Sequence, residues 1–273
     1  RSTLFPYTTL FRSRDLNAFI AAIDTSNVED MSYLFRYCSG TGFTSLDLSS
    51  WDTSKVQSMA ALFKDCSTLT SINLGGSFST ASVTDMKHMF DGCSRLTSLD
   101  LSGFDTSNVA DMSRMFQNCR GLTTLDLSNF DVSSVTTTEY MFNGCTGLTT
   151  IYAGDWRAKL LANDAQTSGM FNGCTSLVGG AGTVYNASHV DGECARIDGS
   201  VKPGYFSAAV EAYAVLVNGR VPTLTIYYDN QKASHIYGTM CEDILSNTQF
   251  AFDEEGVKEV TAIIVFDSSF ANL

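Results

Sequence analysis

The residues best suited to chemistry in this chain are its cysteines, and six of them recur at a nearly constant spacing. Cys38, Cys66, Cys93, Cys119, Cys145 and Cys174 follow one another at intervals of 28, 27, 26, 26 and 29 residues. A disulfide ladder would require Cα separations of about 4.4–6.8 Å, which adjacent strands allow and packed helices do not. Because each cysteine has equivalents in the neighbouring repeats, a column of small buried thiols explains the pattern better. We predict free, buried thiols and leave the pairing of Cys194 and Cys241 open.

The other reactive residues do not form a metal or catalytic site. The chain has no C-x2-C pair, and ligands a full repeat apart do not converge on zinc. Of the three histidines, His88 is expected at a solvent-facing position that varies between repeats, and His189 and His235 lie in loop-like contexts. The glycines at 179–182 are read as turn residues, because no Lys-Ser/Thr pair follows them. We therefore predict no enzyme activity and no cofactor, since catalysis needs a unique convergent set of residues.

Aspartates form three further columns along the repeats. They are Asp24, Asp52, Asp105 and Asp131, then Asp30, Asp85 and Asp111, then Asp47, Asp100 and Asp126. Stacked carboxylates are a possible Ca²⁺ site, because this ion prefers oxygen ligands. The alternative is that the first column caps helices and the other two face solvent. Ser58, Asn73 and Ser79 interrupt the columns, which favours hydrogen bonding over metal binding.

One polar face is the candidate binding surface. Threonines precede the inward-facing Leu or Ile of each expected strand, and Asp, Asn or Tyr follows it. Repeat arrays bind partners over extended surfaces of this kind. The alternative is that these residues only keep the strand face soluble. The candidate face consists of Asp47, Asn73, Thr97, Asp100, Thr123, Asp126, Thr149 and Tyr152.

The elements that must position these columns come from a repeat of about 26 residues. From Val109, apolar residues fall at Met112, Met115-Phe116 and Cys119, which is one face of a short helix. The Asp-Thr-Ser before it is an N-cap signal, and the Leu-x-Leu after it alternates like a strand. A unit this short buries its apolar face only by stacking on its copies. The expected fold is an α/β solenoid, a leucine-rich-repeat-like right-handed coil with one short helix and one short parallel strand per repeat.

A family resemblance supports this expectation. The run LDLSGFDTSNVADMSRMFQNCRGLTTLDLSNFD resembles the BspA-type leucine-rich repeat of bacterial surface proteins, and the likeness recurs six times over residues 22–178. The sixth repeat ends atypically, and residues 195–206 resemble the end of such arrays. The resemblance implies an extracellular or cell-surface bacterial protein that binds host matrix proteins or other cells. The alternative is a passive spacer that presents another domain.

The chain divides into three parts on its sequence. Residues 1–13 resemble a translated sequencing adapter and are expected to be an artefact, the alternative being a genuine N-terminal segment. Residues 14–207 form the repeat array and its cap. Residues 208–273 are β-rich, with strands expected at 212–217, 224–228 and 260–266 and a turn at Asn218-Gly219. We expect this part to begin a second array in a longer protein, the alternative being a finished C-terminal domain.

Composition excludes several classes of partner. The chain has 17 basic and 29 acidic residues and a formal charge of −12, so neither nucleic acid nor anionic lipid is expected to bind. An apolar content of 44% argues against general disorder. No apolar run is long enough to span a bilayer, so no membrane insertion is expected in this segment. The partners expected are proteins.

Overall fold

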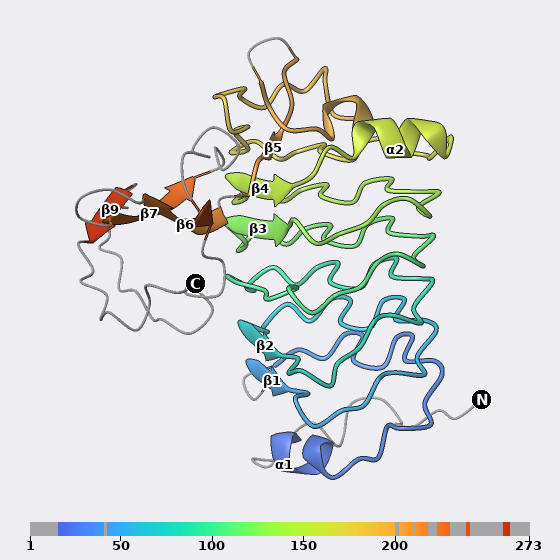
Figure 1. The fold of residues 1–273 in the computed structure, drawn as a ribbon. Coiled ribbons are helices and arrows are strands. Elements are labelled where there is room, and N and C mark those ends of the chain that lie inside the picture. The colour runs from blue at the N-terminus through green and yellow to red at the C-terminus, as the bar shows by residue number, and fades with distance from the viewer. Residues whose placement is uncertain are drawn as a thin grey trace, which may run out of the picture. The chain divides into compact units, whose positions relative to one another are not determined.

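The computed structural model of the chain describes residues 16–40, 43–199, 202–209, 211–217, 223–229, 239–240 and 259–262. The chain separates into two compact units, Arg1–Ala208 and Ala209–Leu273. In the first unit the six repeats are stacked coils, numbered here one to six in chain order (Figure 1). The segment 1–13, predicted to be an artefact, lies outside the described residues.

The regular elements of the first unit are short. They are α1 (Leu16–Ala21), β1 (Ser45–Asp47), β2 (Ser71–Asn73), β3 (Thr124–Leu127), β4 (Thr150–Ala153), α2 (Arg157–Ala162), the 3-10 helix η2 (Gly192–Cys194) and β5 (Phe206–Ser207). The strands form two separate parallel sheets, β1-β2 and β3-β4-β5. Leu46 pairs with Ile72 in the first, and Leu125 pairs with Ile151 in the second.

The predicted leucine-rich-repeat-like α/β solenoid is wrong. No described repeat contains the expected helix between its Val and its Cys, because α1 and α2 both lie elsewhere. The expected strand forms in coils one, two, four and five, but the corresponding residues of coil three, 97–101, are not a strand. The repeats therefore do not join into a continuous helix-plus-strand coil.

Two residues with left-handed backbone break the helix in every repeat. Their φ angles lie between 53° and 77°, whereas an α-helix needs about −63°. The first position holds Tyr33, Ala61, His88, Arg114, Tyr140 and Gly169, and the second holds Tyr37, Asp65, Gly92, Asn118, Gly144 and Gly173. The segment between Val and Cys is consequently a series of tight turns.

Hydrogen bonds in these turns alternate between two directions. The amide of Leu34 donates to Met31 O three residues back, and the next amide, from Phe35, donates across to Leu62 O of coil two at 2.9 Å. The same alternation recurs in the later coils, and parallel bridges link Asp30, Ser58, Asp85, Asp111, Thr137 and Gln166 in one line. Half of the backbone donors that a helix would use internally therefore hold neighbouring coils together.

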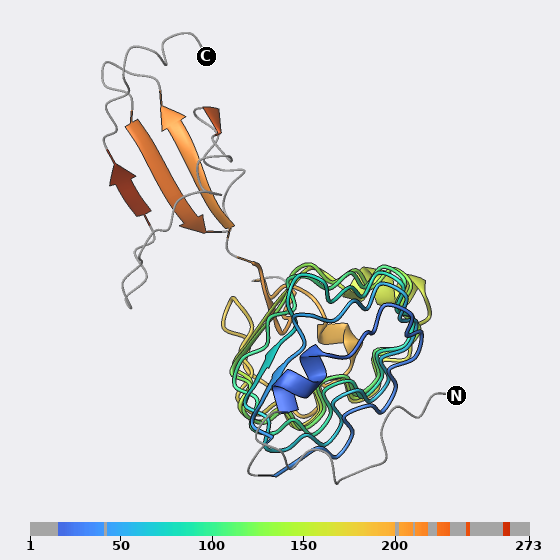
Figure 2. The ribbon, with the colours of Figure 1, turned by 90° about the horizontal axis from the view of Figure 1, so that it is seen from below.

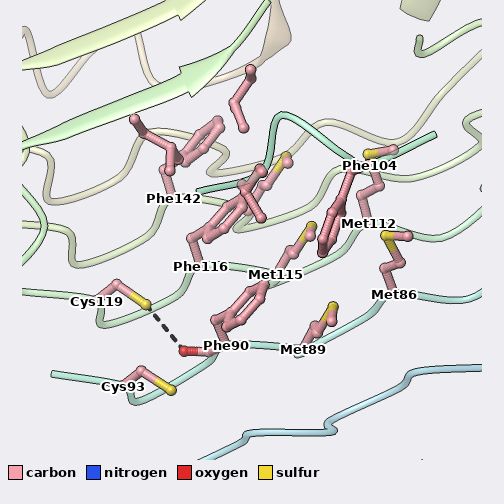
Figure 3. Packing of buried hydrophobic residues seen from close by; sticks show 14 of the residues in the cluster. Met86, Met89, Phe90, Cys93, Phe104, Met112, Met115, Phe116, Cys119 and Phe142 are labelled. Atoms are coloured by element: carbon pink, nitrogen blue, oxygen red, sulfur yellow. Dashed lines mark hydrogen bonds between the residues drawn. The ribbon is translucent and has the colours of Figure 1, made fainter. Parts of the chain in front are cut away.

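Aromatic rings fill the interior as two stacked columns. The longer column is Phe35, Phe63, Phe90, Phe116, Phe142 and Phe171, with centroids 5.4–5.8 Å apart and interplanar angles of 17° or less. Figure 3 shows three of these rings one above another, with methionines beside them. The second column is Phe78, Phe104, Phe130 and Trp156, at 6.2–6.3 Å. Each ring stacks on the equivalent ring of the next coil. One repeat of the sequence therefore corresponds to one step along the stack of rings.

The two ends of the stack are covered differently. At the C-terminal end, Tyr205 and Phe206 meet Phe171 edge-on, at 72° and 69°, which ends the parallel stacking. At the other end α1 lies across the stack (Figure 2), with Ile20 buried and its carbonyl accepting a 2.9 Å hydrogen bond from Trp51 Nε1.

The second unit is an antiparallel sheet in the order β8-β6-β7-β9. Its strands are β6 (Glu211–Val217), β7 (Thr223–Asp229), β8 (Thr239–Met240) and β9 (Glu259–Ala262). The strands predicted at 212–217 and 224–228 are confirmed, whereas the Asn218-Gly219 turn lies outside the described residues and the predicted strand at 260–266 is described only to Ala262. Within the described part of the chain, no helix has the length and apolarity needed to cross a membrane.

Candidate functional site

The predicted strand face is exposed but is not one continuous surface of paired strands. Asp47 lies opposite Asn73 in the β1-β2 pair, and Asp126 lies opposite Tyr152 in the β3-β4 pair. Thr97 and Asp100 belong to coil three, between the two sheets, where no strand forms. All of the candidate residues are exposed except Tyr152, which is half-buried: Asp47, Asn73, Thr97, Asp100, Thr123, Asp126, Thr149 and Tyr152.

Several side chains of this face bond to one another along the stack. Thr149 Oγ1 donates to Thr123 O at 2.9 Å, and Asn73 Nδ2 donates to Asp47 Oδ1 at 3.1 Å. Such contacts between equivalent positions hold neighbouring coils together. Several polar side chains of the strand face therefore stabilise the stack of coils.

The aspartate columns cap turns instead of helices, which corrects the predicted capping role. In each column one carboxylate oxygen accepts the amide of the residue two positions on, at 2.8–3.0 Å. Hydrogen bonds from Lys159 and Ser133 lower the pKa of Asp131 to about 2. Among the described residues, no group of three or more His, Cys, Asp or Glu is arranged to hold a metal ion.

The cysteine column is built from free thiols, as predicted. Each thiol from coil two onward donates to the phenylalanine carbonyl of the preceding coil at 2.9–3.2 Å, as Cys119 does to Phe90 O (Figure 3). Burial raises the pKa of Cys93 and Cys145 to about 12, so both stay protonated donors. Cys38 is only partly buried, and Cys241 lies outside the described residues.

The turns bring together a second set of polar and aromatic residues, named here the turn face, of which Tyr33 and Tyr37 are exposed and the others partly exposed. It consists of Tyr33, Arg36, Tyr37, Lys64, His88, Arg114 and Tyr140. The guanidinium carbon of Arg36 lies 4.5 Å from the ring centroid of Tyr37 and 5.4 Å from that of Tyr33. Arg114 lies 4.9 Å from the ring centroid of Tyr140. Both arginines are therefore held flat against tyrosines, in cation–π geometry.

A polar cluster connects coils two and three on this face. Asp91 is 4% exposed, and its Oδ2 contacts both Lys64 Nζ and His88 Nδ1, the latter at 2.8 Å. Burial alone would raise the pKa of Asp91, but the hydrogen bonds and charges of His88 and Lys64 outweigh it and lower the pKa. His88 was expected at a solvent-facing position; its side chain is instead only 27% exposed and is held in this cluster.

Comparison with known proteins gives the family of the chain. A family model described as "Mycoplasma protein of unknown function, DUF285" matches residues 4–75 and 71–183, well over half of the chain. The chain belongs to the DUF285 family. Neither a curated protein nor a solved structure matches it.

The turn face of this DUF285 protein is not predicted as a site by the repeat pattern, although the sequence holds a signal for it. Strand-face columns repeat Thr or Asp from coil to coil. The first left-handed column instead changes at every coil, from Tyr33 through Ala61 and His88 to Arg114 and Tyr140. A position whose residue type varies among otherwise similar repeats is one where contacts between stacked coils do not require a particular side chain.

Proposed function

We propose that this DUF285 protein is a non-enzymatic, extracellular or cell-surface bacterial protein whose repeat array binds other proteins, on host matrix or on other cells. The observation that carries the proposal is that the aligned reactive side chains make structural hydrogen bonds. The aligned thiols donate to core carbonyls and the aspartates cap turns, while polar side chains lie exposed over several successive coils. Such an arrangement suits recognition over an extended surface better than catalysis. The resemblance of the repeats to BspA-type surface proteins supports the same reading.

A passive spacer is the second candidate. The observation in its favour is that the strand face bonds to itself, as Thr149 does to Thr123 O and Asn73 does to Asp47. A face satisfied in this way gains less from a partner than one with free donors. Under this alternative the array only separates other parts of the protein.

Binding to immobilised matrix proteins separates the two functions. The whole chain is passed over surfaces of collagen, laminin and fibronectin and over fixed cells, with an albumin surface as reference. The proposed function predicts saturable retention at micromolar concentration on at least one of them. No retention on any surface would favour the spacer.

A pair of matched variants tests the predicted strand face directly. Thr97→Arg with Thr123→Arg places two large charged side chains on that face. Ser67→Arg with Thr146→Arg makes the same change of charge at exposed positions after the cysteines. Loss of retention in the first pair alone would assign binding to the strand face.

A further inference from the structure

We propose that the turn face binds an acidic segment of a partner protein, lying extended along the stack of coils. The proposal rests on the proposed protein-binding function and names the surface and the chemistry of the partner. It is carried by three features of the turn face: its line of basic side chains, its two stacked arginines and its exposed tyrosines.

Basic side chains lie on the turn face in each of the first four coils. They are Arg36, Lys64, His88 and Arg114, one per coil. Asp91 already binds Lys64 and His88, so Arg36 and Arg114 are the two left for a partner. Because neighbouring coils pair like parallel strands, about 4.8 Å apart, Arg36 and Arg114 are separated by roughly 14 Å along the stack. An extended peptide rises about 3.3 Å per residue, so about four residues of a partner span the distance. Carboxylates spaced at that interval would reach both arginines.

The two arginines have no carboxylate partner within the described part of the chain. Lys64 pairs with Asp91 and Arg157 with Glu193, but Arg36 and Arg114 lie over tyrosine rings instead. Arg36 Nη2 donates to Tyr37 Oη at 2.8 Å, and its buried Nε has no hydrogen-bond partner there. A guanidinium held flat by an aromatic ring can still donate N–H groups at its outer end to a carboxylate. In Arg36 these are the Nη groups, because Nε is buried.

The tyrosines supply contact area beside these charges. Tyr33 is 42% exposed and Tyr37 is 57% exposed, and both flank Arg36. Tyr and Arg are the residue types that most often anchor protein interfaces. A side chain at Gly169 would place its Cβ only 2.5 Å from Tyr140 Cε1, so this glycine lets the Tyr140 ring lie close to coil six.

The charge of the remaining surface favours an acidic occupant at this place. The chain has 29 acidic residues against 17 basic ones, and aspartates line its strand face and its turns. A cationic partner would be drawn to those columns, whereas an anionic partner is repelled there. On the turn face Asp65 and Asp91 lie beside Lys64, so an anionic partner is attracted to Arg36 and Arg114 in particular. Tyrosine contacts in addition favour a peptide over a simple polyanion.

Fluorescence anisotropy of a labelled oligoglutamate peptide, titrated with the whole chain, tests the proposal. Binding is expected to be saturable and weaker at high salt, because salt screens exposed charges. The double variant Arg36→Ala/Arg114→Ala should weaken it about tenfold or more, equivalent to about 1.4 kcal/mol. The matched control is Arg95→Ala/Arg120→Ala, which removes the same charge from exposed arginines that lie over no ring in the described residues.

Each outcome decides a different point. Equal losses in the two double variants would show that net charge alone attracts the peptide, and the turn-face site would be rejected. Tighter binding of a heparin oligosaccharide than of oligoglutamate would reject a peptide partner. If the chain is retained on matrix proteins and the turn-face variant is retained equally, the proposed function stands and this site does not. If the chain is retained on no matrix protein and binds no oligoglutamate, both the proposed function and the turn-face site are rejected.

Discussion

The interior and the turn face of one segment follow opposite rules, although they alternate along the chain. Phe116 points inward and stacks between Phe90 and Phe142 at 5.7 and 5.8 Å. Arg114, two residues earlier, lies outward over Tyr140. The inward column holds phenylalanine in all six coils, and the outward column holds five different residue types.

The difference teaches what stacking demands of a repeat. An inward ring contacts its own equivalents above and below, so one altered coil leaves unfilled space against two neighbours. Most side chains of the outward column contact solvent on one side, the buried Ala61 being an exception. Their backbone is held by the next coil, as Arg114 N donates to Glu139 O at 2.9 Å. Left-handed backbone costs a non-glycine residue about 1–2 kcal/mol, and this inter-coil bonding lets several residue types tolerate it.

The largest effect is expected from removing an interior ring. Phe116→Ala deletes a fully buried side chain that stacks on both faces, and should lower the free energy of unfolding by about 3–5 kcal/mol. Urea denaturation followed by circular dichroism measures it. Tyr37→Ala removes an exposed ring and serves as the control, with a change of about 0.5 kcal/mol or less. Equal losses in both variants would contradict the division into interior and turn face.

A smaller loss is expected from the buried threonine column. Thr106 Oγ1 donates to Asp131 O at 3.0 Å and accepts Asp131 N at 2.8 Å, and the residue is 1% exposed. Thr106→Val keeps the shape but leaves both groups of Asp131 without this partner, so we expect a loss of about 1–3 kcal/mol. Val132 occupies the equivalent position of coil five, which shows that valine fits.

The control for that column is an exposed threonine. Thr136 Oγ1 also donates across the stack, to Ala110 O at 3.0 Å, but water can replace this bond. Thr136→Val should therefore change stability by only about 0.5 kcal/mol in the same urea titration. If both threonine variants unfold at the same urea concentration as the parent, burial does not decide the strength of these inter-coil bonds.

The sequence allowed the interior to be predicted, but not the backbone that builds it. Apolar spacing from Val109 to Cys119 identifies the inward residues correctly, because inward positions recur in a turn series as they do in a helix. The helix itself fails because Arg114 and Asn118 adopt positive φ. Nothing in the residue type of Arg114 indicates this; the conformation comes from hydrogen bonds to the next coil, which are not local in sequence.

The candidate site was predicted in part. The strand-face residues are exposed as expected, except for the half-buried Tyr152. No strand forms in coil three, so Asp100 aligns with Asp47 and Asp126 in the sequence but shares no sheet with them. The cluster of Lys64, His88 and Asp91 joins two coils, because Lys64 precedes His88 by 24 residues and Asp91 by 27. The cluster forms only because coil two is stacked on coil three, and local sequence patterns do not indicate which side chains that stacking brings together.

Acid should destabilise the array through the aspartates that cap its turns. The pKa of Asp131 in the folded protein is about 2, below its ordinary value of 3.8, so its contribution is present above about pH 4 and is lost as pH falls toward 2. Lys159→Met removes the main cause of the lowered pKa and should reduce this loss. Because the pair is exposed, we expect a difference below about 1 kcal/mol, measured by thermal unfolding at pH 7 and near pH 3. An unchanged difference between the two pH values would show that Lys159 contributes nothing.

The smallest effect on stability is expected on the turn face, where the effect on binding should be largest. Arg114→Ala removes a partly exposed cation–π contact and should change the free energy of unfolding by about 0.5 kcal/mol. The same variant should bind oligoglutamate clearly more weakly than the parent. Phe116→Ala provides the opposite case two residues away, with a large loss of stability and, under conditions where it is folded, unchanged binding. If Arg114→Ala instead unfolds the array as Phe116→Ala does, the turn face is a second core and its varied residues do not mark a binding surface.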